Sequence, residues 1–263
     1  MSEPEPFVDI HCHLMPGIDD GAQSWDDTLA MARMAVADGI TTIICTPHQL
    51  GNFAHNDGAA IRERVKEVQR FLEEHEVPLR VLPGGDVRIE AGMVRRVLSG
   101  EVVSLADHRR HLLLELPHEL YIPLERLLEE LSSAGITGIL SHPERNQGIL
   151  ARADLVRPLV EAGCLMQITA GSMLGAFGPG VQQFCDWMLG EKLVHFVSTD
   201  AHGTKSRRPL LRAAFDHVAR LAGHDTALAL FCRNGAAVAA GTAIDTKTPP
   251  SRKSRSWFAK KAT

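Results

Sequence analysis

The sequence predicts an α/β fold built on a closed barrel of parallel strands, a slightly short relative of the (β/α)8 barrel. Seven short apolar runs, most of them apolar on both faces as buried parallel strands are, alternate with helical patterns. They begin roughly 26 to 38 residues apart, close to the ~30 residues of one strand-helix unit. The chain contains neither G-x-G-x-x-G after the first run nor G-x-x-x-x-G-K-[ST], which disfavours a nucleotide-binding open sheet.

Each apolar run is expected to form one strand, because most runs are rich in β-branched residues or leucine. The strands are expected, in chain order, at residues 7–13, 41–48, 79–88, 111–117, 137–145, 165–172 and 194–202. Helices are expected at segments that end in glycine, which supplies a left-handed stop. Three such segments are residues 26–39, 124–135 and 153–163.

The chain is expected to hold one domain, residues 7–244, after a short extension at residues 1–6. Its 263 residues, 44% of them hydrophobic, suffice for one large core. Residues 245–263 differ, because six lysines and arginines lie there among Ser, Thr and Pro. We expect a disordered basic tail that makes at most weak contact with an anionic membrane surface.

Composition excludes several classes of protein. A net charge of −4 and a pI near 6.3 give no global attraction to nucleic acid. Five cysteines without a C-x-x-C pair argue against a disulfide framework and fit a reducing compartment. The first residues do not resemble a signal peptide, and no apolar run reaches the ~18 residues of a membrane span. We therefore expect a cytoplasmic protein.

Potential metal ligands occur where the strands end. Six of the seven predicted strands carry His, Asp or Glu at or beyond the carboxyl end, and these ends meet at one mouth of a barrel. His11 and His13 are two residues apart on a strand, so both point to the same face, where a metal would bind both neutral rings. The candidate ligands are His11, His13, Asp20, His48, Asp86, Glu115, His142, Asp200 and His202.

This ligand set contains nitrogen and oxygen but no thiolate, which suits Mn²⁺, Fe, Zn²⁺ or Mg²⁺. Nine ligands exceed the needs of one ion, so we expect two or three ions with a bridging carboxylate. Such a centre lowers the pKa of bound water and holds a phosphoryl oxygen. The remaining histidines are not expected to be ligands: His55, His75, His108, His111, His118, His195, His217 and His224.

Two arginines follow ligand-bearing strand ends and are candidates for binding phosphate. Arg145 lies three residues beyond His142, and Arg207 lies five residues beyond His202. Arg208 is a weaker candidate. A cysteine-dependent phosphatase needs C-x5-R, but the residue six positions after each cysteine is never arginine. A thiolate nucleophile is therefore not expected.

These motifs together resemble those of the PHP-superfamily, manganese-dependent protein-tyrosine phosphatases of bacterial capsule and exopolysaccharide synthesis. The resemblance runs in order from about residue 7 to 235 through DIHCHLMPGIDDG, CTPH, PGGDVR, LLELP, SHPER, TAGS, LVHFVSTDAH and SRRP. It implies a distorted (β/α)7 barrel with three metal ions, expected to be manganese. It also implies a substrate, phosphotyrosine on an autophosphorylating bacterial tyrosine kinase that regulates polysaccharide synthesis.

The resemblance further implies how the ligands divide among the ions. His11, His13, Asp86 and Asp200 would hold the first ion; Asp86, Glu115 and His142 the second; Asp20, His48 and His202 the third. Arg145 and Arg207 would bind phosphate. Two positions depart from the family pattern, which usually has Glu at position 86 and often reads SRPP where this chain has SRRP. The shorter Asp86 needs a closer backbone or a shifted second ion.

Two other readings of the sequence remain open. The same site could hydrolyse a small phosphate ester such as histidinol phosphate, as other PHP proteins do. The chain could instead be a metal-stabilised protein that only binds a kinase tail, although an inactive version would be expected to lack ligands. Metal-dependent release of phosphate separates the enzyme from the binding protein.

Overall fold

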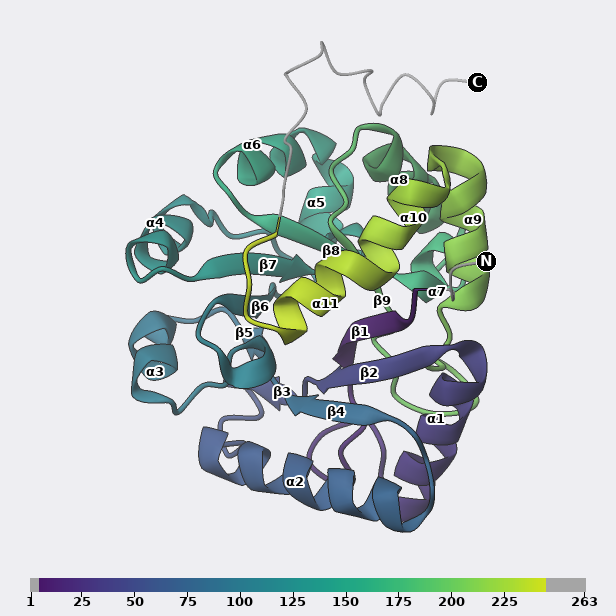
Figure 1. Ribbon diagram of the computed structural model, residues 1–263. Coiled ribbons are helices and arrows are strands. Elements are labelled where there is room, and N and C mark those ends of the chain that lie inside the picture. Colours follow the sequence, from purple (N-terminus) through teal and green to yellow (C-terminus); the bar gives the residue numbers. More distant parts are fainter. Residues whose placement is uncertain (1–4, 245–263) are drawn as a thin grey trace.

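In the computed structural model, which describes residues 5–244, parallel strands close into a barrel (Figure 1). The strands form two sheets, ordered β1-β2-β4 and β3-β5-β6-β7-β8-β9. Their bounds are β1 Phe7–Cys12, β2 Ile40–Cys45, β3 His48–Gln49, β4 Arg80–Pro83, β5 Asp86–Arg88, β6 His111–Glu115, β7 Thr137–Ser141, β8 Leu165–Thr169 and β9 Phe196–Ser198. The predicted tail, residues 245–263, lies outside the described residues.

Two of the barrel strands are interrupted, which is why nine strands follow seven predicted runs. β3 continues β2 after Thr46 and Pro47, and β5 continues β4 after Gly84 and Gly85. A Cβ at Gly84 would lie 2.7 Å from Ile44 Cγ2, so only glycine lets the two strands approach this closely. The Asp86 N–H bridges the break by donating to the Pro47 carbonyl at 3.0 Å.

The barrel closes between its first and last strands. Cys12 and Ala201 form a parallel bridge. The His13 N–H donates to the Ala201 carbonyl at 2.9 Å, and the Asp200 N–H donates to the His11 carbonyl at 2.8 Å. The predicted α/β barrel of seven parallel strands is therefore confirmed, and its closure sets the first and last metal-ligand segments side by side.

Helices surround the strands (Figure 1). They are α1 Trp25–Asp38, α2 Gly58–Glu74, α3 Met93–Ser99, α4 Glu125–Ser133, α5 Gln147–Ala151, α6 Val156–Glu161, α7 Ala170–Met173, α8 Pro179–Gly190, α9 Arg212–Ala222, α10 His224–Leu228 and α11 Asn234–Ala239. The three predicted helical segments all contain helices. Gly39 has φ 101°, Gly135 φ 73° and Gly163 φ 88°, the left-handed conformation expected after the helix ends.

Apolar side chains fill the interior of the barrel toward its amino end. They come from several strands and from α11, which crosses this end of the barrel (Figure 1). The set includes Val8, Ile10, Ile44, Leu113, Ile139, Leu165, Phe196 and Val238. This apolar packing leaves the predicted metal ligands at the opposite, carboxyl end of the barrel.

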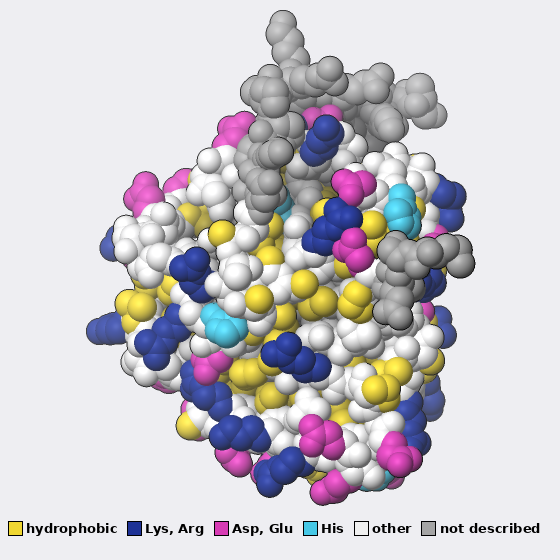
Figure 2. All heavy atoms as spheres, viewed as in Figure 1, with side chains coloured by type: hydrophobic (Ala, Val, Ile, Leu, Met, Phe, Trp, Pro, Cys, Tyr) yellow, Lys and Arg dark blue, Asp and Glu magenta, His cyan; other side chains and the backbone are white. Residues whose placement is uncertain are grey.

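The surface on the side of α11 mixes both signs of charge, with apolar side chains between them (Figure 2). Among residues 5–244, no helix has the length and apolar character needed to cross a membrane.

Candidate metal centre

A shift of register in β1 directs both histidines of the first motif toward the mouth of the barrel. Val8 and Ile10 belong to the apolar interior, and strict alternation would place Cys12 next on that face. The pairing of β1 with β2 is irregular between Asp9 and Cys12, and Cys12 packs outside with the helices. The shift changes which side chains face inward, so His11 rather than Cys12 faces the mouth.

All nine predicted ligands come together at the carboxyl ends of the strands. Their donor atoms form four overlapping groups, and within each group the atoms lie within 4.8 Å of one another. The groups are His13–Asp20–His48–His202, His11–His142–Asp200, His11–His13–Asp86 and His48–Asp86–Glu115. Segments as far apart in sequence as β1 and the end of β9 thus supply one site.

The grouping differs from the expected division among ions at three residues. His13 was expected only with the first ion, but it also lies with Asp20, His48 and His202. His142 was expected beside Asp86 and Glu115, but it lies with His11 and Asp200. His48 was expected only with Asp20 and His202, but its Nδ1 also lies 3.4 Å from Asp86 Oδ2. Which ligands share which ion therefore remains a prediction.

Several atoms of this cluster are chemically suited to a cation. Both carboxylate oxygens of Asp86 are buried without a hydrogen-bond partner, as are His48 Nδ1 and His202 Nε2. Burying an ionised carboxylate without compensation is costly. Divalent metal ions bound among these oxygen and nitrogen atoms would supply that compensation, so the residues present fit a metal centre.

Burial and neighbouring charge set the protonation of several groups in the cluster. Burial lowers the pKa of His142 to about 3 and that of His202 to about 4, so both rings are neutral near pH 7 and have a lone pair free. Burial alone would raise the pKa of Asp200, but His11, His13 and the two arginines lower it well below its usual range. Burial and the charge of Asp86 raise the pKa of Glu115 to about 7.

Asp19 orients two of the ligand residues and was not identified from sequence. Its Oδ2 lies 2.7 Å from His13 Nδ1 and accepts the His48 backbone N–H at 3.1 Å. A proton on Nδ1 leaves His13 Nε2 free for a metal. The G-I-D-D-G turn contains two acids, of which Asp20 was predicted to be a ligand; its side chain is 56% exposed. The Asp19 side chain is fully buried and contacts the ligand residue His13.

Gln167 of β8 and Asp9 of β1 also support the cluster. Gln167 Oε1 lies 2.8 Å from His11 Nδ1, although β8 was the strand on which no ligand was predicted. Asp9 accepts the His11 N–H at 3.2 Å and the Thr199 hydroxyl at 2.5 Å, which ties β1 to the residues just before Asp200. A single Gln or Asp inside a strand does not indicate from sequence alone that it supports a metal ligand.

Both predicted phosphate-binding arginines reach the same buried carboxylate. Arg145 Nη1 contacts Asp200 Oδ2, and Arg207 Nη2 lies 2.6 Å from Asp200 Oδ1. Arg207 has φ 47° and its carbonyl accepts the His202 N–H at 2.9 Å, so its loop is tied to a ligand residue. The next residue, Arg208, is exposed.

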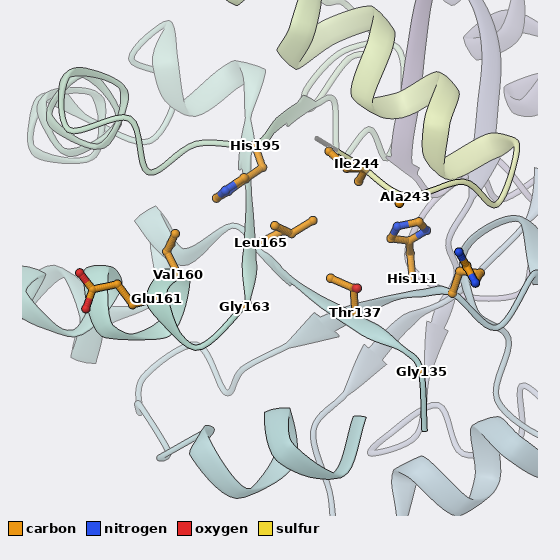
Figure 3. A pocket seen from close by; sticks show the side chains of 11 residues that line it. His111, Gly135, Thr137, Val160, Glu161, Gly163, Leu165, His195, Ala243 and Ile244 are labelled. Atoms are coloured by element: carbon orange, nitrogen blue, oxygen red, sulfur yellow. The ribbon is translucent and has the colours of Figure 1, made fainter. Parts of the chain in front are cut away.

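None of the eight histidines predicted not to be ligands joins a potential metal group within residues 5–244. Two of them, His111 and His195, line a cavity of about 380 Å³ at the amino end of the barrel, with Leu165 and Ile244 (Figure 3). This cavity lies at the end of the barrel opposite the metal cluster.

The model of one protein family, described as capsular polysaccharide synthesis, CpsB/CapC, matches residues 7–240. This chain belongs to the CpsB/CapC family. The predicted PHP-type family resemblance is thereby confirmed.

Two CpsB/CapC relatives illustrate the range of similarity. Tyrosine-protein phosphatase YwqE of Bacillus subtilis is 39% identical over 203 residues, which are 76% of this chain and 79% of the relative. Tyrosine-protein phosphatase CpsB of Streptococcus pneumoniae is 26% identical over 233 residues, 87% of this chain and 96% of the relative.

Solved structures agree with the fold. A chain from the crystal structures of YwqE from Bacillus subtilis and CpsB from Streptococcus pneumoniae, described as unique metal-dependent tyrosine phosphatases, superposes with a TM-score of 0.89. It is 34% identical, and the match covers 94% of this chain and 99% of that one. Histidinol phosphate phosphatase of Lactococcus lactis, at 15% identity and a TM-score of 0.50 over 87% of this chain and 97% of that one, shares the fold.

Proposed function

We propose that this protein hydrolyses phosphotyrosine on an autophosphorylating bacterial tyrosine kinase that regulates capsular or extracellular polysaccharide synthesis. As a member of the CpsB/CapC family, the chain is a metal-dependent tyrosine phosphatase. The proposal adds the kinase as substrate, the nine ligands, manganese as the metal and a cytoplasmic location.

The observation that carries the proposal is the convergence on Asp200. Arg145 and Arg207 both contact this buried carboxylate, which also belongs to the potential metal group of His11 and His142. The two arginines proposed to bind phosphate are therefore separated from the potential metal ligands only by the Asp200 side chain. A phosphate that entered here would meet both, as phosphoryl transfer requires.

Three manganese ions, with Fe, Zn or Mg as alternatives, would be held by the nine ligands. When bound, such ions lower the pKa of a coordinated water and stabilise the negative charge on phosphoryl oxygens. Asp19 and Gln167 fix the rings of His13 and His11 through hydrogen bonds of 2.7 and 2.8 Å. The imidazole rings of His11 and His13 are thus held in fixed orientations before a metal ion binds.

The two arginines would bind the phosphate through their guanidinium groups, which match its oxygens in pairs. The leaving group is a phenolate, whose conjugate acid has a pKa of about 10, so it departs with little proton assistance. Hydrolysis of this substrate therefore needs no dedicated general acid. The leaving group of an alkyl phosphate is more basic, so its departure depends more strongly on a general acid.

A cysteine nucleophile does not fit this structure. All five cysteines are buried. Burial raises the pKa of Cys164 to about 12 and that of Cys232 to about 11, and it raises the pKa of Cys12 well above its ordinary value. A buried thiol with a raised pKa is a poor nucleophile. The five unpaired thiols also support the proposed cytoplasmic location.

A phosphatase panel on metal-stripped protein tests the proposal. Phosphotyrosine peptides and histidinol phosphate would be supplied with Mn²⁺, Fe²⁺, Zn²⁺ or Mg²⁺ added back singly. We expect phosphate release from phosphotyrosine, fastest with Mn²⁺. Faster turnover of histidinol phosphate would favour the small-molecule reading, and no turnover of phosphotyrosine with any metal would refute the proposal.

Matched histidine variants link that activity to the cluster. The double variant His11→Ala/His13→Ala should lose metal-dependent phosphate release. The double variant His75→Ala/His224→Ala removes two exposed imidazoles away from the cluster and should retain it. Equal loss in both would show that the histidine-rich mouth is not the source of activity.

A further inference from the structure

Arg145 lies against an aromatic ring at the mouth of the barrel. Its guanidinium carbon is 4.7 Å from the centroid of the Phe177 ring. Arg145 is largely buried, with 14% of its side chain exposed, whereas Phe177 remains 37% exposed. One side of the ring is therefore covered by the arginine, and another part of the ring faces solvent beside the phosphate-binding group.

The loop that carries Phe177 is ordered by its own backbone. It links α7 to α8, next to the end of β8 (Figure 1). The Ala176 N–H donates to the Gly171 carbonyl at 2.9 Å, and the Gly178 N–H donates to the Gly175 carbonyl at 3.0 Å. A Cβ at Gly171 would lie 3.6 Å from Phe177 Cε2, so the ring rests on the backbone of α7. These contacts fix the position of the ring.

Two further exposed apolar residues lie on the loops next to Arg145. Residues 5–244 contain five large hydrophobic side chains that are exposed: Leu98, Leu120, Leu174, Phe177 and Leu221. Leu174 shares the α7–α8 loop with Phe177. The Leu120 carbonyl accepts a hydrogen bond of 3.0 Å from Asn146, the residue after Arg145. Three of the five thus lie on the two loops that adjoin Arg145.

We propose that Phe177 is a specificity residue, whose covered side holds the Arg145 guanidinium and whose exposed edge contacts the phenyl ring of the substrate. This inference rests on the proposed function and adds the group that selects an aromatic phosphate ester. A phosphate bound by Arg145 carries its phenyl ring within reach of an adjacent aromatic side chain. Edge-to-face contact between the two rings would favour phosphotyrosine over phosphates of serine or of sugars, which lack a ring.

Non-hydrolysable phosphonates test this contact without requiring turnover. Calorimetric titration of the Mn²⁺-loaded protein would give the Kd for phenylphosphonate and for methylphosphonate. The ratio of the two isolates the contribution of the phenyl ring, because both ligands carry the same phosphonate. We expect the wild-type protein to prefer phenylphosphonate.

The variants are Phe177→Ala, Phe177→Leu and, as control, Leu221→Ala on α9. Phe177→Ala should reduce the preference for phenylphosphonate by about 3- to 10-fold, since aromatic pairs contribute beyond their buried area. The preference of Phe177→Leu for phenylphosphonate should fall between those of Phe177→Ala and the wild type. The preference of Leu221→Ala should match that of the wild type. Circular dichroism would check that each variant is folded.

Three outcomes would overturn the inference: no preference for phenylphosphonate in the wild type, an unchanged ratio in Phe177→Ala, or equal weakening of both phosphonates. The last would mean that Phe177 acts only through Arg145. These results are separable from failure of the proposed function, which would appear as absent hydrolysis of phosphotyrosine even if the phosphonate ratio changed as expected.

Discussion

The carboxylate of Asp19 lies 2.7 Å from His13 Nδ1 and accepts the backbone N–H of His48 at 3.1 Å. One buried acid thus orients a ligand from β1 and fixes the backbone of a ligand at β3. Burial lowers the pKa of His13, but the charge and hydrogen bond of Asp19 outweigh it and raise the pKa to about 9. Near pH 7 without metal the His13 ring therefore carries a proton on both nitrogens. A metal ion that binds Nε2 would displace the proton there, while Asp19 keeps the proton on Nδ1.

Asp19→Asn should therefore weaken metal binding more than it weakens the fold. Partners of metal-bound histidines typically contribute 10- to 100-fold in affinity, so we expect the Kd for Mn²⁺ to rise by about that factor. Titration calorimetry with Mn²⁺ measures it. Asp26→Asn removes an exposed acid at the start of α1 and is the matched control. Equal Mn²⁺ affinity in the two variants would contradict this role for Asp19.

Arg207 and Arg208 are adjacent, yet the structure separates their roles. Arg207 contacts Asp200 in the cluster, and Arg208 is exposed. Removing one group that stabilises developing charge typically costs ~10²–10³ in rate, so Arg207→Ala should lower kcat/KM on a phosphotyrosine peptide by about 100-fold. Arg208→Ala should change it by less than about 3-fold. Similar losses in the two variants would mean that the SRRP segment acts as a general basic patch.

The cysteines are expected to be dispensable. Because burial raises the pKa of Cys164 to about 12 and keeps all five thiols from solvent, iodoacetamide should leave the native enzyme active. Treatment with a chelator should instead abolish activity. Phosphate release after each treatment gives the comparison, and inactivation by iodoacetamide before any unfolding would point to a thiolate mechanism.

His195 makes stability depend on pH at a distance from the metal cluster. Its Nδ1 accepts the Met166 backbone N–H at 3.0 Å, and burial lowers its pKa to about 4. The unfolded chain, with a histidine pKa near 6.5, binds the proton more readily. Stability from the neutral ring is therefore present above about pH 6.5 and is lost as the pH falls toward 4, by about 3 kcal/mol.

His195→Asn should flatten this dependence. Urea unfolding at several pH values between 4 and 7, with Mn²⁺ held constant, gives the slope for wild type and variant. The difference between the two isolates His195, because the metal ligands are common to both. If the free energy of unfolding depended equally on pH in wild type and variant, the His195 imidazole would not titrate as its buried contact requires.

The sequence was sufficient for the fold class and for where each strand ends, because parallel strands are apolar on both faces and polar groups appear abruptly at their carboxyl ends. His48, Glu115 and Asp200 each follow such a run, so their meeting at one mouth could be predicted. The breaks at Pro47 and Gly84–Gly85 could not, since an interrupted strand depends on how its neighbour approaches.

The supporting residues were missed for a different reason. Gln167 and Asp9 act through hydrogen bonds to His11 across strands, and these depend on register and on the shift in β1. Register is a property of the folded sheet that alternation alone does not fix. The same limit applies to His142 and His48, whose neighbours differ from those that the family resemblance implied.

The central claim is that the nine side chains at the mouth hold several divalent ions. Crystals grown with Mn²⁺ and measured at the manganese absorption edge test it most directly. The account predicts anomalous peaks bounded by His13, Asp86 and Asp200. No peak there, or peaks only at surface acids remote from β1, would contradict it.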